Sequence, residues 1–214
     1  MFIDSNVKKV WFTGDTHFGH KNVIQYCSRP FNDVQHMNEC MITNWNDCIG
    51  EDDIVFHLGD FAFVKEPSKI IKQLNGKIYL IPGNHDKGIL EESKSVFAPP
   101  LTLLTKFRVM DSITEVDIQV EDEKMRFVLC HYAMRVWNKS HYGAIHLYGH
   151  SHGTLPDYPE SRSMDVGVDC HNYTPISLDD VLLAMYRKVF KPVDHHEDKT
   201  KTREEIIKKN DKSV

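Results

Sequence analysis

Short apolar runs that each end at a polar side chain constrain the fold of this chain more than any other feature. The runs, with the Asp, Asn or His residues that close them, are 10–17, 54–60, 78–86, 127–131 and 145–152, with 164–169 as a weaker sixth. Continuous apolar runs of this length are typical of strands buried on both faces, as in a parallel sheet. Because ligands bind outside the carboxyl ends of such strands, we expect these polar side chains to meet at one rim. The arrangement predicts a polynuclear metal site.

The first half of the chain predicts strands that alternate with helices. One helix is expected over 34–49, with Asn32-Asp33 supplying its N-cap and an apolar stripe at helical spacing. A second helix fits 67–74, because Pro67 suits the first turn of a helix. The order strand, helix, strand, helix, strand predicts right-handed crossovers between parallel strands.

The second half of the chain changes to an antiparallel pattern. Residues 107–120 alternate and are rich in β-branched side chains, and 125–130 resume a strand after a polar turn, which predicts a hairpin feeding a second sheet. Residues 177–186 predict a closing helix with acidic residues in its first turn. We therefore expect one domain over 1–190 and, because charged and polar residues dominate it, a flexible tail over 191–214.

Composition narrows the function classes. The formal charge of -5 argues against binding of long nucleic acid, because such binding usually needs a clustered basic face. It does not exclude that binding. The five cysteines are odd in number and show no CxxC spacing. The chain shows neither a basic-then-apolar leader nor an apolar stretch of membrane-spanning length. We therefore expect a reduced, cytoplasmic protein that does not contact a membrane, and small anionic substrates remain open because bound metal ions would reverse the local field.

The candidate metal ligands combine oxygen and nitrogen donors without a thiolate. They are two carboxylates, one amide and four histidines: Asp15, Asp60, Asn84, His17, His131, His150 and His152. Such a set suits Mn, Fe, Zn, Co or Ni better than Ca or Mg. The D-x-H and H-x-H spacings place both members on the same side of an extended segment. Glycines precede four of the groups, which would let the backbone pass close to the metal cluster: Gly14, Gly59, Gly83 and Gly149.

In chain order these residues form the series D-x-H, G-D, G-N-H-D, H and G-H-x-H. The series resembles that of the calcineurin-like metallophosphoesterase superfamily, and residues 11–20 resemble the opening of its small stand-alone bacterial and phage members. Five blocks in the same order, spanning 15–152, make chance agreement very improbable. The resemblance implies an α/β fold, a four-layer αββα sandwich of two mixed β-sheets flanked by helices. It places a dinuclear metal site at the carboxyl ends of the strands.

The resemblance also implies a role for each residue of the site. Asp15, His17 and His152 would hold the first metal, Asn84, His131 and His150 the second, and Asp60 would bridge them. Manganese is the metal we expect, with Fe, Zn, Ni or Co as alternatives. A hydroxide that bridges the two ions would attack phosphorus, and the ions would clamp the attacking and leaving oxygens. His85 would act as general acid, and Asp86 would orient it unless Asp86 is a surface carboxylate.

Departures from related sequences indicate the substrate class. Protein Ser/Thr phosphatases of this superfamily carry G-D-x-V-D-R-G, whereas here Phe61-Ala62-Phe63 follows Asp60. The absence of the substrate-clamping Arg favours a phosphodiesterase acting on a small nucleotide-like or cyclic diester. Phe61 and Phe63 could then shape a site for the organic group. The alternatives are a phosphomonoesterase, a nuclease and a non-catalytic scaffold, and the intact ligand set argues against the scaffold.

Five further residues on apparent loops are candidate substrate contacts: His20, Asn22, Arg135, Trp137 and His141. Binding residues concentrate on loops carried by a rigid scaffold. Arg135 could pair with phosphate and Trp137 could stack on a base, the alternative being an ordinary solvated loop with a packing Trp. His20 could equally begin the helix that follows, and Asn22 could cap it. His57 and His146 lie inside apolar runs, so we expect them to be core or hydrogen-bonding residues.

Overall fold

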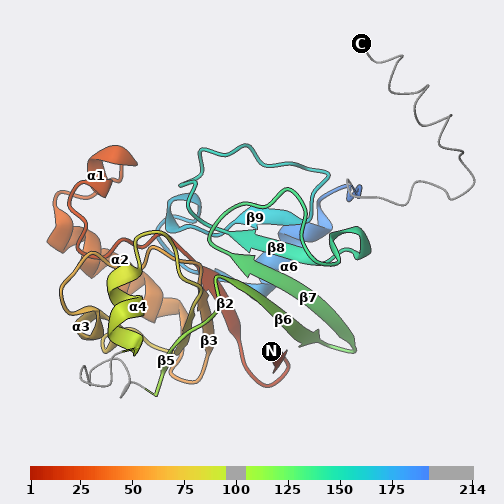
Figure 1. The fold of residues 1–214 in the computed structure, drawn as a ribbon, viewed down its shortest axis with the longest axis horizontal. Helices are drawn as coiled ribbons and strands as arrows, with labels where there is room; N and C mark the ends of the chain where they lie inside the picture. Colours follow the sequence, from red (N-terminus) through yellow and green to blue (C-terminus); the bar gives the residue numbers. More distant parts are fainter. Residues whose placement is uncertain (95–104, 193–214) are drawn as a thin grey trace, which may run out of the picture.

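Two five-stranded mixed sheets dominate the computed structural model, which describes residues 1–94 and 105–192 (Figure 1). In order across the first sheet, the strands are β10 (Ile176–Ser177), β2 (Val10–Thr13), β3 (Ile54–His57), β4 (Lys77–Leu80) and β5 (Phe107–Val109). Across the second sheet they are β1 (Phe2–Asp4), β6 (Ile113–Val120), β7 (Glu123–Cys130), β8 (Ile145–Tyr148) and β9 (Ser163–Asp165). All six apolar runs therefore contain strands.

The helices flank these sheets. They are α1 (Val23–Tyr26), α2 (Val34–Cys48), α3 (Pro67–Ile71), α4 (Lys87–Lys94) and α6 (Leu178–Tyr186), with two 3-10 turns, η1 (Ser140–Tyr142) and η2 (Val168–Cys170). The Asp33 side chain accepts a hydrogen bond from the His36 N–H at 2.9 Å, so the predicted cap of α2 is confirmed. Helix α3 ends before the predicted residue 74, because the N–H groups of Gln73 and Leu74 bond three residues back and tighten the chain into a turn.

The parallel strands of the first sheet place three loops side by side. Strands β2, β3 and β4 run parallel, with Thr13 paired to His57 and His57 paired to Leu80. Helix α2 connects β2 to β3, and α3 connects β3 to β4. The segments that follow these three strands consequently leave the sheet at one edge, as the predicted crossovers require.

Residues 107–120 form two strands in different sheets, not the single strand that their alternation predicts. Strand β5 pairs parallel with β4, whereas β6 pairs antiparallel with β7 in the expected hairpin. The chain crosses between the sheets at the polar pair Asp111-Ser112, where the Asp111 carbonyl accepts a hydrogen bond from the Thr114 hydroxyl at 2.9 Å. Alternation continues across the break, so the pattern could not show it.

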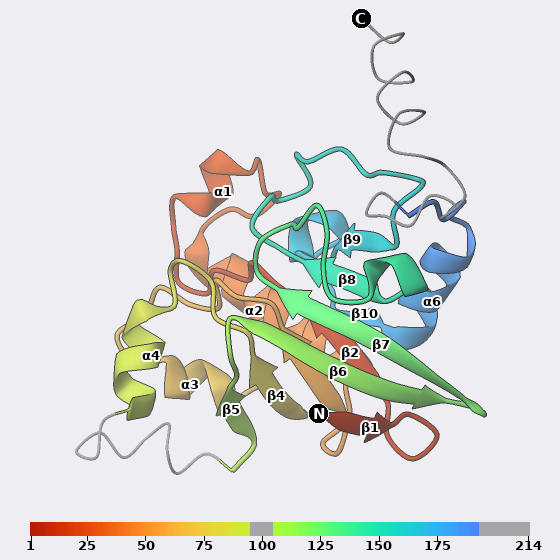
Figure 2. The same cartoon turned by 45° about the vertical axis from the view of Figure 1, so that its right-hand side comes forward.

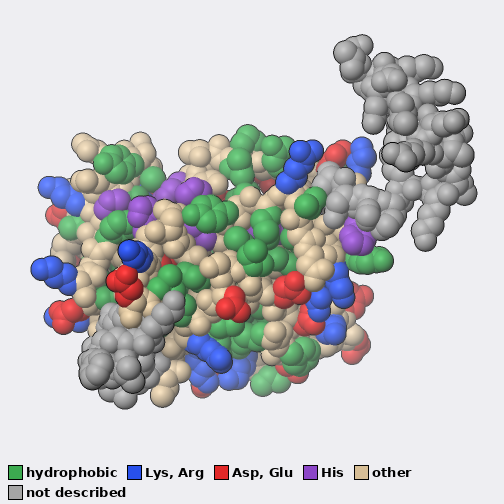
Figure 3. Space-filling view, viewed as in Figure 1, with side chains coloured by type: hydrophobic (Ala, Val, Ile, Leu, Met, Phe, Trp, Pro, Cys, Tyr) green, Lys and Arg blue, Asp and Glu red, His purple; other side chains and the backbone are tan. Residues whose placement is uncertain are grey.

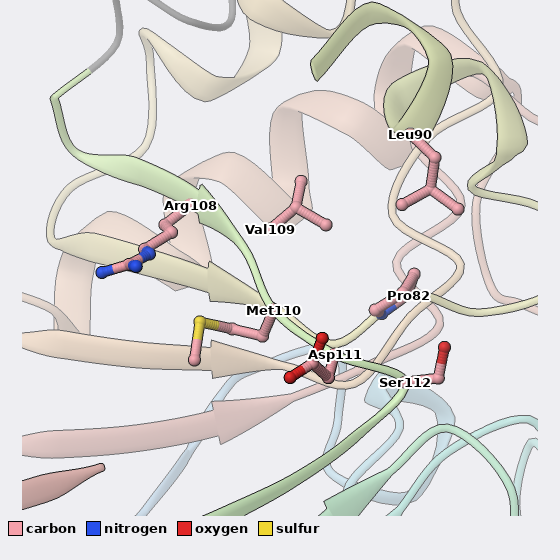
Figure 4. A pocket seen from close by; sticks show the side chains of 7 residues that line it. All are labelled: Pro82, Leu90, Arg108, Val109, Met110, Asp111 and Ser112. Atoms are coloured by element: carbon pink, nitrogen blue, oxygen red, sulfur yellow. The ribbon is translucent and has the colours of Figure 1, made fainter. Parts of the chain in front are cut away.

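This crossover borders a cavity of about 500 Å³. Figure 4 shows Leu90 of α4 and Val109 of β5 on two sides of it, with Pro82 from the segment after β4 below Leu90. Arg108 points away from both Leu90 and Pro82. The cavity thus touches the segment that carries Asn84, but its lining contains none of the predicted ligands.

The main core lies between the two sheets, which lie one behind the other in Figure 2. The ring of Phe12 in β2 lies 5.7 Å from that of Phe56 in β3 and 5.6 Å from that of Phe127 in β7, so it joins the sheets. Buried residues of α6 pack against this core. A second cluster covers the other face of the first sheet with α2, α3 and α4 side chains, including Met37, Met41, Trp45, Ile71 and Ile89.

The outer face of the second sheet is covered by the segment between β7 and β8. Val128 of β7 packs there with Trp137 and Ala144. The predicted class, an α/β sandwich of two mixed sheets flanked by helices, is confirmed. Within residues 1–94 and 105–192, no helix has the length and apolarity needed to cross a membrane. The domain boundary at 190 stays a prediction, because residues 193–214 of the predicted tail, with His195 and His196, lie outside the described residues.

Candidate metal centre

The seven predicted ligands follow the carboxyl ends of five strands drawn from both sheets. Asp15 and His17 follow β2, Asp60 follows β3, Asn84 follows β4, His131 follows β7, and His150 and His152 follow β8. Figure 3 shows histidine side chains gathered on one part of the surface. The structure therefore places these residues together at one rim, as the positions of the apolar runs predict.

Six of these side chains form two groups of potential ligand atoms. Asp15, His17 and His152 make one group and Asp60, His131 and His150 the other, and within each group the atoms lie within 4.8 Å of one another. Asn84 joins the second group, because its Oδ1 is 3.0 Å from His131 Nε2. Asp60 Oδ2 is 3.6 Å from His17 Nε2 and 3.6 Å from His131 Nε2. The Asp60 carboxylate thus stands between the two groups, where a bridging ligand must be.

The first group contains buried polar atoms without partners in the described part of the chain. Asp15 is fully buried, and neither its two carboxylate oxygens nor the two ring nitrogens of His17 have a hydrogen-bond partner there. Burial raises the pKa of Asp15 well above its ordinary value and lowers the pKa of His17 to about 2. A divalent cation would satisfy these atoms and favour an ionised carboxylate beside a neutral imidazole, the forms that bind metal. The residues present therefore fit a metal ion.

Five of the seven predicted ligands have a left-handed backbone conformation. Their φ angles are 54° for Asp15, 50° for His17, 54° for Asp60, 66° for His150 and 46° for His152. Such conformations cost about 1–3 kcal/mol for a residue other than glycine, and they cluster at functional sites where the surroundings enforce them. The loops therefore direct their side chains toward the site at the expense of backbone stability.

Two glycines allow these loops to approach the ligands closely. A Cβ atom added to Gly83 would lie 2.7 Å from the Asp60 backbone nitrogen and 2.9 Å from His131 Cε1. One added to Gly149 would lie 2.7 Å from Asp15 Oδ2. Contacts this short are repulsive, so the prediction that glycines bring the backbone close to the cluster is confirmed at both positions.

Replacing Gly83 with alanine is expected to weaken Mn²⁺ binding about tenfold or more, because the added methyl group would push Asp60 and His131 apart. Isothermal titration of the metal-free protein with Mn²⁺ measures the effect. Gly88→Ala is the matched control, since a Cβ atom there would meet nothing within 4 Å. Equal Mn²⁺ affinities for the two variants would contradict the expectation.

Asp86 neither orients the His85 side chain nor lies at the surface. It is 1% exposed, and its carboxylate accepts hydrogen bonds from the backbone N–H groups of Asp60 at 2.7 Å, Phe61 at 2.9 Å and Gly83 at 2.8 Å. Among the described residues, the Asp86 carboxylate bonds to these backbone groups and makes no hydrogen bond to the exposed His85 imidazole. The backbone N–H of His85 donates to Asp60 Oδ1 at 2.9 Å. Asp86 therefore positions the segment that carries Asp60, which corrects the predicted catalytic role.

Arg29 and Asp169 form a buried network behind the first group that was not predicted as part of the site. The Arg29 guanidinium is 4% exposed and donates two hydrogen bonds of 2.8 Å to the Asp169 carboxylate. It also donates to the backbone carbonyls of Asp15 at 2.7 Å and Thr16 at 3.1 Å. Asp169 Oδ2 lies 2.6 Å from His152 Nδ1, which leaves Nε2 of that ring for a metal. Asp169 ends the weakest of the six apolar runs, 164–169, which is a sequence signal that could have identified it. Nothing in the sequence pattern distinguishes Arg29.

His57 and His146 are both fully buried and hydrogen-bonded. His57 Nε2 lies 2.9 Å from the Thr16 hydroxyl, which links the segments after β2 and β3, and burial lowers the pKa of His57 to about 3. His146 Nδ1 lies 2.8 Å from the Val128 carbonyl, and its Nε2 accepts a hydrogen bond from the Met134 N–H at 3.1 Å. Both act as core hydrogen-bonding residues, as expected.

Of the candidate substrate contacts, the structure brings His20 to the centre. Its ring stacks on Phe63 with centroids 4.1 Å apart and lies 5.5 Å from the ring of His17. Phe63 is 38% exposed, whereas Phe61 is fully buried in the core and cannot contact a substrate. Asn22 precedes α1 but makes no side-chain hydrogen bond that caps it.

Trp137 and His141 lie away from the centre. Trp137 is 9% exposed, and its indole N–H donates to the Ala144 carbonyl at 2.9 Å, so it packs on the second sheet and is not available to stack on a base. His141 lies in η1 before β8 begins, whereas His150 follows the end of that strand. Arg135 is exposed and lines a cavity that also contains Tyr148.

Comparison with known proteins agrees with this geometry. The model of the calcineurin-like phosphoesterase family matches residues 8–170. An uncharacterized protein of Methanocaldococcus jannaschii is 34% identical over 183 residues, which cover 81% of this chain and 89% of that protein. The gene 66 protein of Mycobacterium phage L5 is 32% identical over 85 residues, or 37% of this chain and 41% of that protein.

A solved structure shares the fold. It is a protein of unknown function from Aquifex aeolicus, with a TM-score of 0.59 and 21% identity, and the match covers 82% of this chain and 98% of that one. The matched family model and the two groups of potential ligands together indicate a metal-dependent hydrolase of phosphate esters. The chain belongs to the calcineurin-like phosphoesterase family.

Proposed function

We propose that this protein is a dinuclear metal-dependent phosphodiesterase that acts on small nucleotide-like or cyclic diesters. The observation that carries the proposal is the position of the Asp60 carboxylate, 3.6 Å from a histidine of each ligand group. Asp15, His17 and His152 would hold one ion, Asn84, His131 and His150 the other, and Asp60 both. Manganese is the ion we propose, because the donor set combines carboxylate, amide and imidazole.

The residues around the ligands fix their orientation. Two divalent ions bound here would lower the pKa of water and neutralise charge on the phosphate. His131 Nδ1 lies 2.7 Å from the Leu58 carbonyl, and Asp169 holds His152 Nδ1, so each ring turns its Nε2 toward the site. The Asp86 carboxylate accepts a hydrogen bond from the Asp60 backbone N–H, and the His85 backbone N–H donates one to Asp60 Oδ1. The chain therefore supplies a ligand set with little freedom to rearrange.

His85 is the residue we propose as proton donor to the leaving oxygen. Its side chain is exposed, and its ring lies 5.9 Å from that of His17 and 4.8 Å from that of Phe63. An imidazole at this position can approach an ester bound over the two ligand groups from the solvent side. Histidine is the side chain that enzymes most often use for proton transfer to a leaving group.

The preference for diesters rests on charge. A monoester dianion carries one more negative charge than a diester and gains more from a positioned side-chain cation. The cation that contacts these groups, Arg29, is buried and bonded to Asp169 and to two backbone carbonyls. On the open side the centre is bordered by Phe63 and His20. This border is aromatic and carries no fixed cation, so it suits the organic part of a second ester group better than free phosphate oxygens.

The Mn²⁺-loaded protein is expected to hydrolyse bis-(p-nitrophenyl) phosphate faster than p-nitrophenyl phosphate. Asp60→Asn is expected to abolish turnover of both esters, because it removes charge from the group shared by the two ions. Absorbance of released p-nitrophenolate measures both rates. Faster monoester cleavage would replace the proposal with a phosphomonoesterase, and metal-independent turnover would contradict both.

A further inference from the structure

The segments that carry the candidate ligands also line a cavity of about 470 Å³ on the outer side of the second sheet. Its volume lies within the range of roughly 300–1,000 Å³ typical of small-molecule sites. The lining is mainly apolar, with Met134, Leu155 and two tyrosines, Tyr148 and Tyr158. It also includes one cation, Arg135, one carboxylate, Glu160, and two serines. The proposed function does not use this cavity.

The cavity lies close to the candidate metal centre along three segments. Its lining includes Ala133, the second residue after His131, and Tyr148, the second before His150. Leu155 is the third residue after His152. An extended chain spans at most about 3.6 Å per residue, so each of these positions lies within roughly 7–11 Å of a candidate ligand. The cavity therefore borders three of the segments that carry candidate ligands.

Several lining side chains lack partners in the described part of the chain. Tyr148 is 4% exposed, yet its hydroxyl makes no hydrogen bond with a described residue. The Arg135 guanidinium makes neither a hydrogen bond nor an ion pair there. Tyr158 is 62% exposed and Leu155 is 38% exposed. The cavity thus offers apolar faces together with two hydrogen-bond donors that no described residue uses.

We propose that this cavity binds a planar heteroaromatic group of the substrate, of about nucleoside size, while the attached phosphorus lies at the metal centre. This inference rests on the proposed phosphoesterase function. A tyrosine ring can stack on any heteroaromatic ring, because every such ring has a π-face. The Tyr148 hydroxyl and the Arg135 guanidinium pair with ring nitrogens or carbonyl oxygens, which a purely aliphatic ester group lacks. The aromatic face sought at Trp137 from the sequence is supplied here by the exposed ring of Tyr158.

The test compares thymidine 5′-(p-nitrophenyl) phosphate with methyl p-nitrophenyl phosphate, which release the same product, using the Mn²⁺-loaded full chain. The wild-type protein is expected to show a higher kcat/KM for the thymidine ester. Tyr158→Ala is expected to lower the ratio of the two kcat/KM values about tenfold, because it removes one stacking face. Tyr186→Ala is the matched control, since Tyr186 lies on α6 and is 88% exposed. A ratio that is equal in the wild type and Tyr158→Ala would overturn the inference.

A binding measurement separates this inference from the proposed function. Calorimetric titration with thymidine 5′-monophosphate and with methyl phosphate reports on the cavity without requiring turnover. Tighter binding of the nucleotide in the wild type, lost in Tyr158→Ala and kept in Tyr186→Ala, supports the cavity even if neither ester is hydrolysed. In that case the proposed function alone fails. Equal affinities for the two ligands in the wild type would overturn the cavity assignment even if both esters are hydrolysed.

Discussion

Replacing His85 with alanine is expected to lower kcat for diester hydrolysis about 10²–10⁴-fold while Mn²⁺ content stays unchanged. The separation of the two effects follows from the contacts of His85. Its backbone N–H, which alanine retains, holds Asp60 Oδ1 at 2.9 Å. Its imidazole is exposed and contacts the rings of Phe63 and His17 without forming part of either group of potential ligands. Steady-state kinetics and metal analysis of the purified variant measure the two quantities.

The dependence on the leaving group identifies the step in which His85 acts. A proton donor assists most when the departing oxygen is strongly basic, so the loss should be larger for a phenyl than for a p-nitrophenyl diester. His36→Ala is a suitable control, because the His36 ring on α2 accepts a hydrogen bond from the Asn32 N–H, and its own backbone N–H, which alanine retains, donates to the Asp33 side chain. Equal losses for the two leaving groups would exclude proton donation. A parallel loss of Mn²⁺ would show instead that the side chain supports the ligands.

The positions of the candidate ligands were predictable because they depend on strand order alone. Each apolar run ends at the rim, and Asp15, Asp60 and His131 follow as the next polar side chains. The backbone of these loops was not predictable, because five candidate ligands adopt left-handed conformations that side-chain patterns do not encode. The break at Asp111-Ser112 was missed for a similar reason, since alternation continues through a change of sheet.

Residues that act through other residues were the hardest to predict. Asp86 lies beside His85 in the chain, which suggested a partnership, but its carboxylate folds back onto three backbone N–H groups. Trp137 lies in a loop between two ligands, yet it packs on the outer face of the second sheet. In both cases the local sequence allows an exposed and a buried position equally, and tertiary contacts decide. Arg29 is the strongest example, because its partner Asp169 is distant in the sequence.

Removing Arg29 is expected to have a large effect on both stability and metal binding. Arg29→Met leaves the Asp169 carboxylate buried with His152 as its remaining side-chain partner, and breaking a buried ion pair from one side typically costs about 3–5 kcal/mol. Burial favours the neutral form of Asp169, but hydrogen bonds from His152 and Arg29 outweigh it and hold the pKa of Asp169 below its ordinary value. Urea denaturation of the metal-free variant measures the loss of stability.

Asp169→Asn tests the other half of the network. It removes the charge that fixes His152, so Mn²⁺ affinity is expected to fall about 10–100-fold, as it does for other residues that orient metal ligands. Its effect on stability should be smaller than that of Arg29→Met, and the double variant should be more stable than Arg29→Met alone, because no buried carboxylate remains unpaired. Calorimetric Mn²⁺ titration and a double-mutant cycle of the unfolding free energies measure these differences.

The pair Arg126–Asp117 on β7 and β6 is a matched control within the same chain. Its guanidinium also makes two hydrogen bonds to one carboxylate, at 2.7 and 3.0 Å, but both side chains are partly exposed. Water screens such a pair, so Arg126→Met should cost no more than about 1 kcal/mol and leave Mn²⁺ affinity unchanged. Similar costs at the two pairs would mean that burial adds nothing to the Arg29 network. Arg29 would then be a stabilising contact with no bearing on the metal centre, and the orientation of His152 would have to come from elsewhere.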